Sequence, residues 1–338
     1  MRFIETKGSW RQMGRQYGEA CLAELPGCID RCTGKLTRNP TLYTRALESL
    51  QRVLESHTPE LLEETAGMSE ASGIPIDTLL GYRFYNELRK RMVEGCSVIF
   101  MADGEEGPLL GRNCDISELD AAIQVCRVCR PTNGPASMIV TYLGLSSSSG
   151  FNEHGLGLGG ASGQSDARGD HDGLPGGALL HLLLNRCRSV ADARDLMDRH
   201  RFVGKPMNIL AGDDRGDSVL FELIPGKKPS GIPRRQNLAW QACTDFFLSG
   251  MTSVKAQPCQ MQSRYARYGR IVHQLGEGHV AATRNGLQRL LTEVAQPGLC
   301  IAESHMPTAY SMIMVLKDRS MHLSDGHPAK TEYVKTSL

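Results

Sequence analysis

The chain has 338 residues, of which 41% are hydrophobic and 22% are charged, and its formal net charge is +1. This composition is that of a globular protein able to bury a sizeable core, and the near-neutral charge excludes the broad basic field of a nucleic-acid-binding protein. The N-terminus has no apolar secretory signal and no apolar run is long enough to cross a membrane, so we expect a soluble, cytoplasmic protein with reduced cysteines.

The first ninety-odd residues have the pattern of helices. Apolar residues at helical spacing predict helices over residues 8–24 and 41–55. Pro59, followed by acidic residues, predicts a helix that starts after Thr58, and Asp77 is expected to cap another. We therefore expect a helical segment before the β-rich part of the chain that begins at Cys96.

The pattern changes at Cys96, where short β-rich runs begin. CSVIFMA and PLLGRNCDI flank the turn GEEG and predict a hairpin. Further strands are expected at 137–143, 155–159, 207–212, 218–224, 237–243, 309–316 and 320–324, and helices at 177–186, 190–200, 262–275 and 283–295. Blocks of helices between groups of strands predict an α+β fold, with helices packed on a largely antiparallel sheet system.

The pair Gly95–Cys96 is the sharpest chemical feature. Attack of the Cys96 sulfur on the Gly95 carbonyl, followed by hydrolysis, would free a new N-terminal cysteine. A glycine at this place permits a strained backbone and leaves the carbonyl open to attack. The freed α-amino group has an ordinary pKa of about 7.7–8.0, against about 8.5 for a thiol, so it can serve as the base for its own side chain.

The hairpin supplies partners for Cys96. If the GEEG turn is centred between its two glutamates, antiparallel pairing places Cys96 opposite Asp115, with Asn113 on the same face and Arg112 on the other. Asp115 would then orient the α-amino group or the thiol. The local pattern alone also fits a surface hairpin that carries an incidental cysteine.

Other motifs favour structural roles. The CxxC pair Cys126 and Cys129 lacks a second pair, which favours small buried hydrophobes over a zinc site. The glycines of GLGLGGASG have no βαβ context for a nucleotide. The histidines form no close ligand cluster; they include His154, His171, His181 and His305. We therefore expect no metal ion and no bound cofactor.

Several segments together resemble a known family. GSWRQMGRQYGEA, GCSVIF, GRNCDI and GFNEHGLGLGG, in this order and spacing, resemble the acyl-coenzyme A:6-aminopenicillanic acid acyltransferase family of self-processing N-terminal-nucleophile enzymes (peptidase C45), and more distantly choloylglycine hydrolases and penicillin V acylases. The resemblance implies a four-layer αββα sandwich, with residues 1–95 as a helical propeptide or small subunit and residues 96–338 as the catalytic chain.

The resemblance also implies roles for individual residues. Cys96 matches the nucleophile and Asp115 the aspartate that hydrogen-bonds it. Arg112 matches an arginine that choloylglycine hydrolases place three residues before that aspartate. Asn152 matches an oxyanion-hole asparagine, whose amide N–H would stabilise the charge on a tetrahedral intermediate.

Near the C-terminal half the match is less direct. Arg264 resembles the arginine of the hydrolases' Ser-Arg-Phe segment, with Arg267 and Arg270 as alternatives. Cys114 stands where the family usually has tryptophan. Asp245 stands where relatives have an asparagine of the oxyanion hole, and an ionised carboxylate there would repel the oxyanion. Asp245 is therefore protonated, binds a cationic substrate group or is misaligned; we favour the second.

These inferences predict an enzyme that cuts itself at Gly95–Cys96 and then hydrolyses amides, or transfers acyl groups to an amine, through a Cys96 thioester. The expected partners are a small amide or acyl-thioester substrate, an amine acceptor and the cleaved N-terminal fragment as a subunit, with no nucleic acid or membrane. Coenzyme A thioesters would be substrates. The alternative is an uncleaved, non-catalytic binding protein that keeps the fold.

Overall fold

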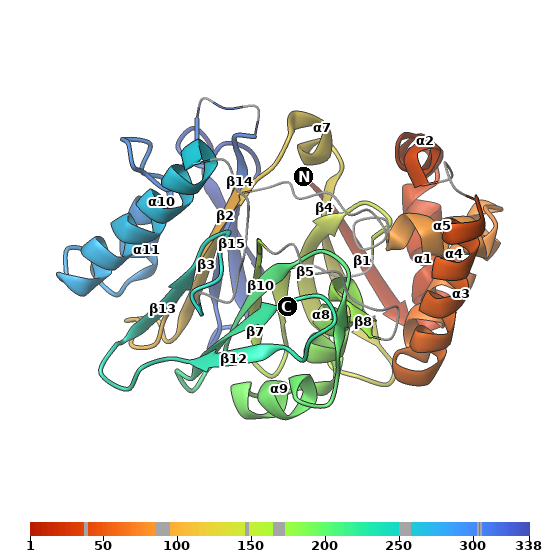
Figure 1. The fold of residues 1–338 in the computed structure, drawn as a ribbon, viewed down its shortest axis with the longest axis horizontal. Coiled ribbons are helices and arrows are strands. Elements are labelled where there is room, and N and C mark those ends of the chain that lie inside the picture. Colours follow the sequence, from red (N-terminus) through yellow and green to blue (C-terminus); the bar gives the residue numbers. More distant parts are fainter. Residues whose placement is uncertain are drawn as a thin grey trace.

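The structure is a computed structural model that describes residues 1–36, 40–84, 95–145, 149–164, 173–249, 258–302, 304 and 306–338. Two stacked β-sheets lie at its centre, with helices gathered at the sides (Figure 1). We call the larger one sheet A and the smaller one sheet B.

Sheet A has eight strands in the order β1-β4-β5-β6-β7-β10-β11-β12. The first pair is parallel and the other neighbours are antiparallel. The strands are β1 (Arg2–Gly8), β4 (Gln124–Pro131), β5 (Ser137–Tyr142), β6 (Ser149–Asn152), β7 (Gly157–Ser162), β10 (Met207–Gly212), β11 (Ser218–Leu223) and β12 (Ser230–Pro233).

Sheet B has six strands in the order β13-β2-β3-β14-β15-β16, and all its pairs are antiparallel. Its strands are β13 (Trp240–Cys243), β2 (Gly95–Met101), β3 (Leu109–Asp115), β14 (Thr308–Val315), β15 (Ser320–Ser324) and β16 (Tyr333–Ser337). A separate short parallel pair joins β8 (Leu174–Pro175) to β9 (Phe202–Val203).

The helices fall into groups that cover different parts of the sheets (Figure 1). Helices α1–α5 stand beside the β1 edge of sheet A, α8 and α9 cover its outer face, and α10 and α11 cover the outer face of sheet B. Their bounds are α1 (Trp10–Cys21), α2 (Leu25–Leu36), α3 (Pro40–His57), α4 (Pro59–Ser72), α5 (Ile76–Arg83), α7 (Glu118–Ala121), α8 (Gly176–Arg186), α9 (Val190–Met197), α10 (Pro258–Gly276) and α11 (Arg284–Leu291).

Separate apolar cores lie between these layers. One fills the space between sheet A and the helices outside it, and includes Leu183 and Ile209. A second lies between the sheets, where β2 and β3 face β7 and β10, and includes Phe100 and Leu210. A third joins sheet B to α10 and α11. The molecule is therefore an αββα sandwich, and the predicted α+β fold class is confirmed.

The N-terminal segment is joined to sheet A by a strand, β1, that was not predicted. β1 pairs with β4 over its whole length, so residues 1–95 are not purely helical. A capping box at Ser9 and Gln12 then starts α1. α1 crosses α4 closely, since a Cβ on Gly14 would meet the Glu64 carbonyl oxygen at 2.0 Å.

Most predicted elements are present, with small shifts at their ends. The strands at 207–212 and 320–324 have the predicted bounds, and Ser189 caps α9 as a hydroxyl acceptor. The predicted cap Asp77 is wrong, because α5 starts two residues earlier than that cap implies, at Ile76, and Pro75 takes the cap position. His171 and His305 lie outside the described residues. In the part of the chain that is described, no helix is long and apolar enough to cross a bilayer.

Candidate active site

The β2–β3 hairpin is present, but its register differs by one residue from the prediction. Cys96 pairs with Cys114, and Gly95 pairs with Asp115. The tight turn lies at GEEG as expected, with the Gly107 amide donating to the Gly104 carbonyl. However, Met101 pairs with Leu109, so the loop around the turn is asymmetric. Residues 102 and 103 lie between β2 and the turn, whereas residue 108 alone lies between the turn and β3. This extra residue shifts the register.

A one-residue shift exchanges the faces of a strand. The predicted placement of Asp115 and Asn113 on the Cys96 face is therefore wrong, and so is that of Arg112 on the opposite one. Arg112 shares the inner face, between the sheets, with Cys96. Asn113 points outward, where its amide donates to the carbonyls of Leu291 and Leu299.

On the inner face, a buried guanidinium contacts the Cys96 sulfur. Arg112 Nη2 lies 3.4 Å from Cys96 Sγ. Its Nε donates to the Gly160 carbonyl at 2.7 Å and its Nη1 to the Tyr310 hydroxyl at 2.6 Å. Two contacts thus fix the guanidinium while the third nitrogen faces the sulfur. Cys96 is only 1% exposed, so its charge balance depends on these neighbours.

On the outer face, Asp115 belongs to a chain of alternating charges. Arg267 Nη1 lies 2.9 Å from Asp115 Oδ2, and its Nη2 lies 2.8 Å from Asp245 Oδ1. Arg264 Nε continues the chain, 2.6 Å from Asp245 Oδ2. Thr308 donates its hydroxyl to Asp115 Oδ1 at 2.6 Å. Two carboxyl groups therefore face two guanidinium groups at the start of β2.

Burial dominates the protonation of these carboxyl groups. It raises the pKa of Asp115 to about 8, although Arg267 and the Thr308 hydroxyl oppose the shift. Burial also raises the pKa of Asp245, against the opposing effect of Arg267 and Arg264. Asp115 is thus able to exchange a proton near neutral pH.

Gly95 lies beside this charged chain, at the start of β2 and directly before Cys96. A Cβ at this position would lie 2.8 Å from Arg267 Nη2 and 3.2 Å from Asp115 Oδ2. Gly95 belongs to an extended strand and is not among the described glycines with positive φ. The absence of a side chain at this position lets the ends of Arg267 and Asp115 approach the start of β2 closely.

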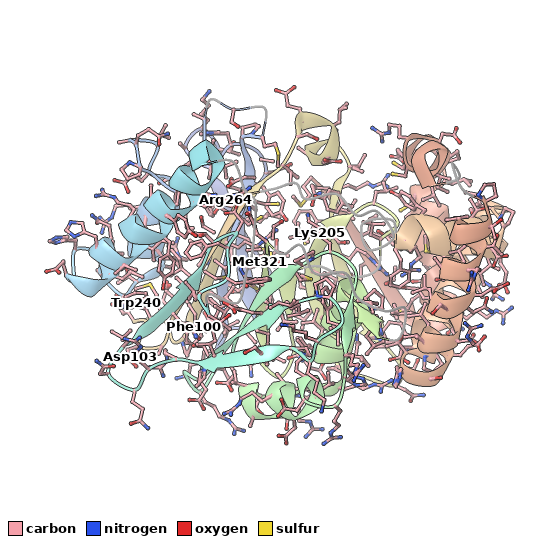
Figure 2. All side chains as sticks on the ribbon, in the orientation of Figure 1. Phe100, Asp103, Lys205, Trp240, Arg264 and Met321 are labelled. Carbon is pink, nitrogen blue, oxygen red and sulfur yellow. The ribbon has the colours of Figure 1, made fainter. Side chains whose placement is uncertain are left out.

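Of three arginines on α10, Arg267 is the one that contacts Asp115. The assigned Arg264 reaches only as far as Asp245, and Figure 2 shows it on the part of α10 near the strands of sheet B. Arg270 instead pairs with Glu293. The spacing 264-267-270 signals arginines along one side of a helix, but it does not show which one the sheet meets.

The structure also accounts for the charge of Asp245. In the structure its carboxyl group pairs with two guanidinium groups of the chain itself, Arg264 and Arg267, and Arg267 is shared with Asp115. Its segment is fixed from sheet A, because the Asn208 amide donates to the carbonyls of Thr244 and Phe246. Asp245 therefore helps to hold the Arg267 guanidinium in place.

Asn152 has a different role from the one that the resemblance implied. Its amide nitrogen donates to the carbonyls of Leu184 and Cys187 at 2.9 and 2.8 Å. Its carbonyl oxygen accepts from the amides of His154 and Leu156. Both amide hydrogens are used, so the oxyanion-hole assignment is wrong in this structure. Asn152 instead ties the end of β6 to the end of α8.

Two further residues of the site were not predicted. Tyr310 pairs with Cys114 across β3 and β14, and its hydroxyl accepts from Arg112. Thr308 reaches Asp115 from the start of β14, and its oxygen also accepts from the Ile301 amide. Thr308 is 193 residues from Asp115 in sequence and Tyr310 is 198 residues from Arg112, and the pairing of β14 with β3 brings them together.

The chain matches a known protein family. Residues 102–330 match the family described as acyl-coenzyme A:6-aminopenicillanic acid acyl-transferase. No curated protein matches the chain by sequence.

Solved structures similar to the chain have low sequence identity. A penicillin V acylase from Agrobacterium tumefaciens has 15% identity and a TM-score of 0.48, over 72% of this chain and 86% of that one. A Caenorhabditis elegans ortholog of N-acylethanolamine-hydrolyzing acid amidase has 15% identity and a TM-score of 0.49, over 72% and 100%. A variant of conjugated bile acid hydrolase from Clostridium perfringens has 12% identity and a TM-score of 0.47, over 72% and 97%.

Proposed function

The chain belongs to the acyl-coenzyme A:6-aminopenicillanic acid acyl-transferase family of amidohydrolases and acyltransferases, and from this premise we propose that Cys96 is the nucleophile of a self-processing enzyme. The observation that carries the proposal is the position of its sulfur, 3.4 Å from the buried Arg112 guanidinium. The residue before it is the glycine that packs against Asp115 and Arg267. A nucleophile, a fixed cation and a titratable carboxyl group thus meet at one peptide bond.

The first step is cleavage of the Gly95–Cys96 bond. The Cys96 sulfur attacks the Gly95 carbonyl carbon through a five-membered ring, the C–N bond breaks, and the nitrogen of Cys96 leaves as an amine. That nitrogen needs a proton, and Asp115 supplies it, since burial raises its pKa to about 8. Water then hydrolyses the Gly95 thioester, which releases the Gly95 carboxylate and restores the Cys96 thiol.

The second step uses the new chain terminus. The α-amino group of Cys96 takes the thiol proton, because its ordinary pKa of about 7.7–8.0 lies close to that of a thiol. The thiolate attacks an amide or thioester carbonyl and forms a thioester at Cys96. Water as acceptor gives hydrolysis, and an amine as acceptor gives acyl transfer. The substrate is a small amide or acyl thioester, and a coenzyme A thioester fits as acyl donor.

Arg112 stabilises the sulfur in both steps. A guanidinium beside a cysteine favours the thiolate form. Arg112 is held by Gly160 and Tyr310, so its charge stays next to Cys96 when the sulfur gains negative charge. Preorganised charge of this kind needs no rearrangement during the reaction.

We also propose that residues 1–95 stay bound as a subunit after cleavage. β1 contributes an edge strand to sheet A. Glu64 of α4 is buried and lies 2.7 Å from Arg127 of β4, while its other oxygen pairs with Arg83. Separation of the fragment would leave Arg127 without its carboxylate, which is costly for a buried charge.

Denaturing gel electrophoresis after incubation of the purified chain tests the proposal. We expect two fragments, residues 1–95 and residues 96–338, that co-elute under native conditions. Cys96→Ala is expected to stay intact, and Cys243→Ala, which removes another buried cysteine, is expected to cleave as the parent does. Cleavage of Cys96→Ala would refute the mechanism. An intact parent chain would support the non-catalytic binding protein instead.

A further inference from the structure

Two cysteines face each other across the β2–β3 hairpin. Cys96 and Cys114 are directly paired residues of antiparallel strands, and both lie in the core between the sheets. Directly paired residues have Cα atoms about 4.5 or 5.5 Å apart, depending on the hydrogen-bonding pattern. Both values lie in the range of about 4.4–6.8 Å that a disulfide spans. The two thiols can therefore be joined without moving either strand.

A third cysteine on this face is placed less favourably. Cys243 of β13 pairs with Val98, so it is the diagonal neighbour of Cys96 on the other side of β2. Diagonal neighbours lie about 7–8 Å apart. That separation exceeds the limit of about 7 Å beyond which a disulfide requires backbone movement. Geometry thus selects Cys114 as the partner of Cys96.

The surroundings favour reaction of the Cys96 sulfur with an electrophile. Arg112 Nη2 lies 3.4 Å from this sulfur, and an adjacent guanidinium favours the reactive thiolate. We propose that Cys96 and Cys114 form a reversible disulfide site that a hydroperoxide oxidises. The site rests on the proposed function in one respect: the route by which an acyl donor reaches Cys96 also admits a peroxide.

The reaction balances in two steps. The Cys96 thiolate attacks one oxygen of hydrogen peroxide, the O–O bond breaks, and the sulfur becomes a sulfenic acid while hydroxide leaves and takes a proton. The Cys114 thiol then attacks that sulfur, the S–O bond breaks, and a second water leaves. Two thiols and one peroxide give one disulfide and two waters. The nucleophile is lost until a dithiol reduces the bond.

Tryptic peptide mapping of the full chain after treatment with hydrogen peroxide tests the site. Trypsin cuts after Arg112, so the two cysteines fall on separate peptides, one ending at residue 112 and one spanning residues 113–127. We expect a linked pair whose mass is two hydrogens below the sum, and its loss after dithiothreitol. Fragmentation assigns the bond, because Cys126 shares the second peptide.

The same map reports processing separately. A cleaved chain gives a first peptide of residues 96–112, and an intact chain gives residues 92–112. A map with only the longer peptide would refute self-cleavage, whatever the state of the thiols. The disulfide is judged by the linkage alone.

Matched variants complete the test. Cys243→Ala is expected to keep the linked pair. Cys114→Ala is expected to lose it, and Cys96 then gains two oxygen atoms as a sulfinic acid that dithiothreitol does not reverse. Linkage of Cys96 to Cys243 or Cys126, absence of any linkage, or reversible oxidation in Cys114→Ala would overturn the proposal.

Discussion

Replacement of Arg267 by methionine tests the charged chain behind Gly95. Arg267 is 3% exposed and lies 2.9 and 2.8 Å from the carboxylates of Asp115 and Asp245. Asp245 keeps Arg264 in this variant, whereas Asp115 keeps the Thr308 hydroxyl and, among the residues that the structure describes, no other ion-pair partner. The variant therefore leaves one buried carboxylate without a counter-charge.

Removal of one partner from a buried ion pair costs about 3–5 kcal/mol. We expect the free energy of unfolding to fall by this amount at about pH 9, where Asp115 is ionised, and by less at about pH 6, where burial keeps it protonated. Urea denaturation measures both values. A Cys96→Ala background keeps every variant a single chain.

Arg270→Met is the matched control, one helical turn further along α10. Its pair with Glu293 is partly exposed, with side chains 28% and 23% accessible. An exposed pair contributes about 0.2–1 kcal/mol, so this variant is expected to lose little. Asp115→Asn should restore part of the stability lost in Arg267→Met. Equal losses in the two arginine variants, or no recovery with Asp115→Asn, would refute the reasoning.

Three further predictions concern single residues. Because burial raises the pKa of Asp115 to about 8, the folded chain keeps a proton that the unfolded chain loses near pH 3.9. The free energy of unfolding, measured with urea, should therefore fall as pH rises from about 4 to about 8. Asp115→Asn should flatten this dependence on pH. Arg112→Lys loses the fixed guanidinium, and loss of about 1.5–3 kcal/mol from a charged hydrogen bond should slow cleavage on gels by about 10- to 150-fold. An unchanged cleavage rate would exclude this role of Arg112. Asn152→Ala should lower the free energy of unfolding by about 1–3 kcal/mol yet leave the cleavage rate of the folded chain unchanged. Slower cleavage by this variant would show that Asn152 takes part in the reaction.

Local sequence patterns were sufficient for the family and for many of the elements, although β1, β4, β12 and β16 were not predicted. The hairpin shows where local reasoning fails. Its turn lies at GEEG, as predicted. The prediction assumed equal numbers of residues on both sides of the turn, but one extra residue lies before it. This residue shifts the register by one, so Arg112 and Asp115 lie on the faces opposite to those predicted. A single residue of register thus decided which side chain meets the sulfur.

Long-range contacts explain the other differences. Arg267 was only an alternative to Arg264, because the packing of α10 on sheet B selects the arginine that enters the site. β1 was missed, since its edge position depends on a parallel partner far along the chain. Asn152 follows a family motif, yet four hydrogen bonds at the turn use its whole amide.

Acylation of the mature chain tests the central claim most directly. After incubation with an acyl-coenzyme A or amide donor, we expect the tryptic peptide 96–112 to carry the added acyl mass on its N-terminal cysteine, and we expect hydroxylamine treatment of the folded chain before digestion to remove that mass. The claim would be contradicted if the label were found on another residue, or if the labelled peptide began at residue 92 with its link to Gly95 intact.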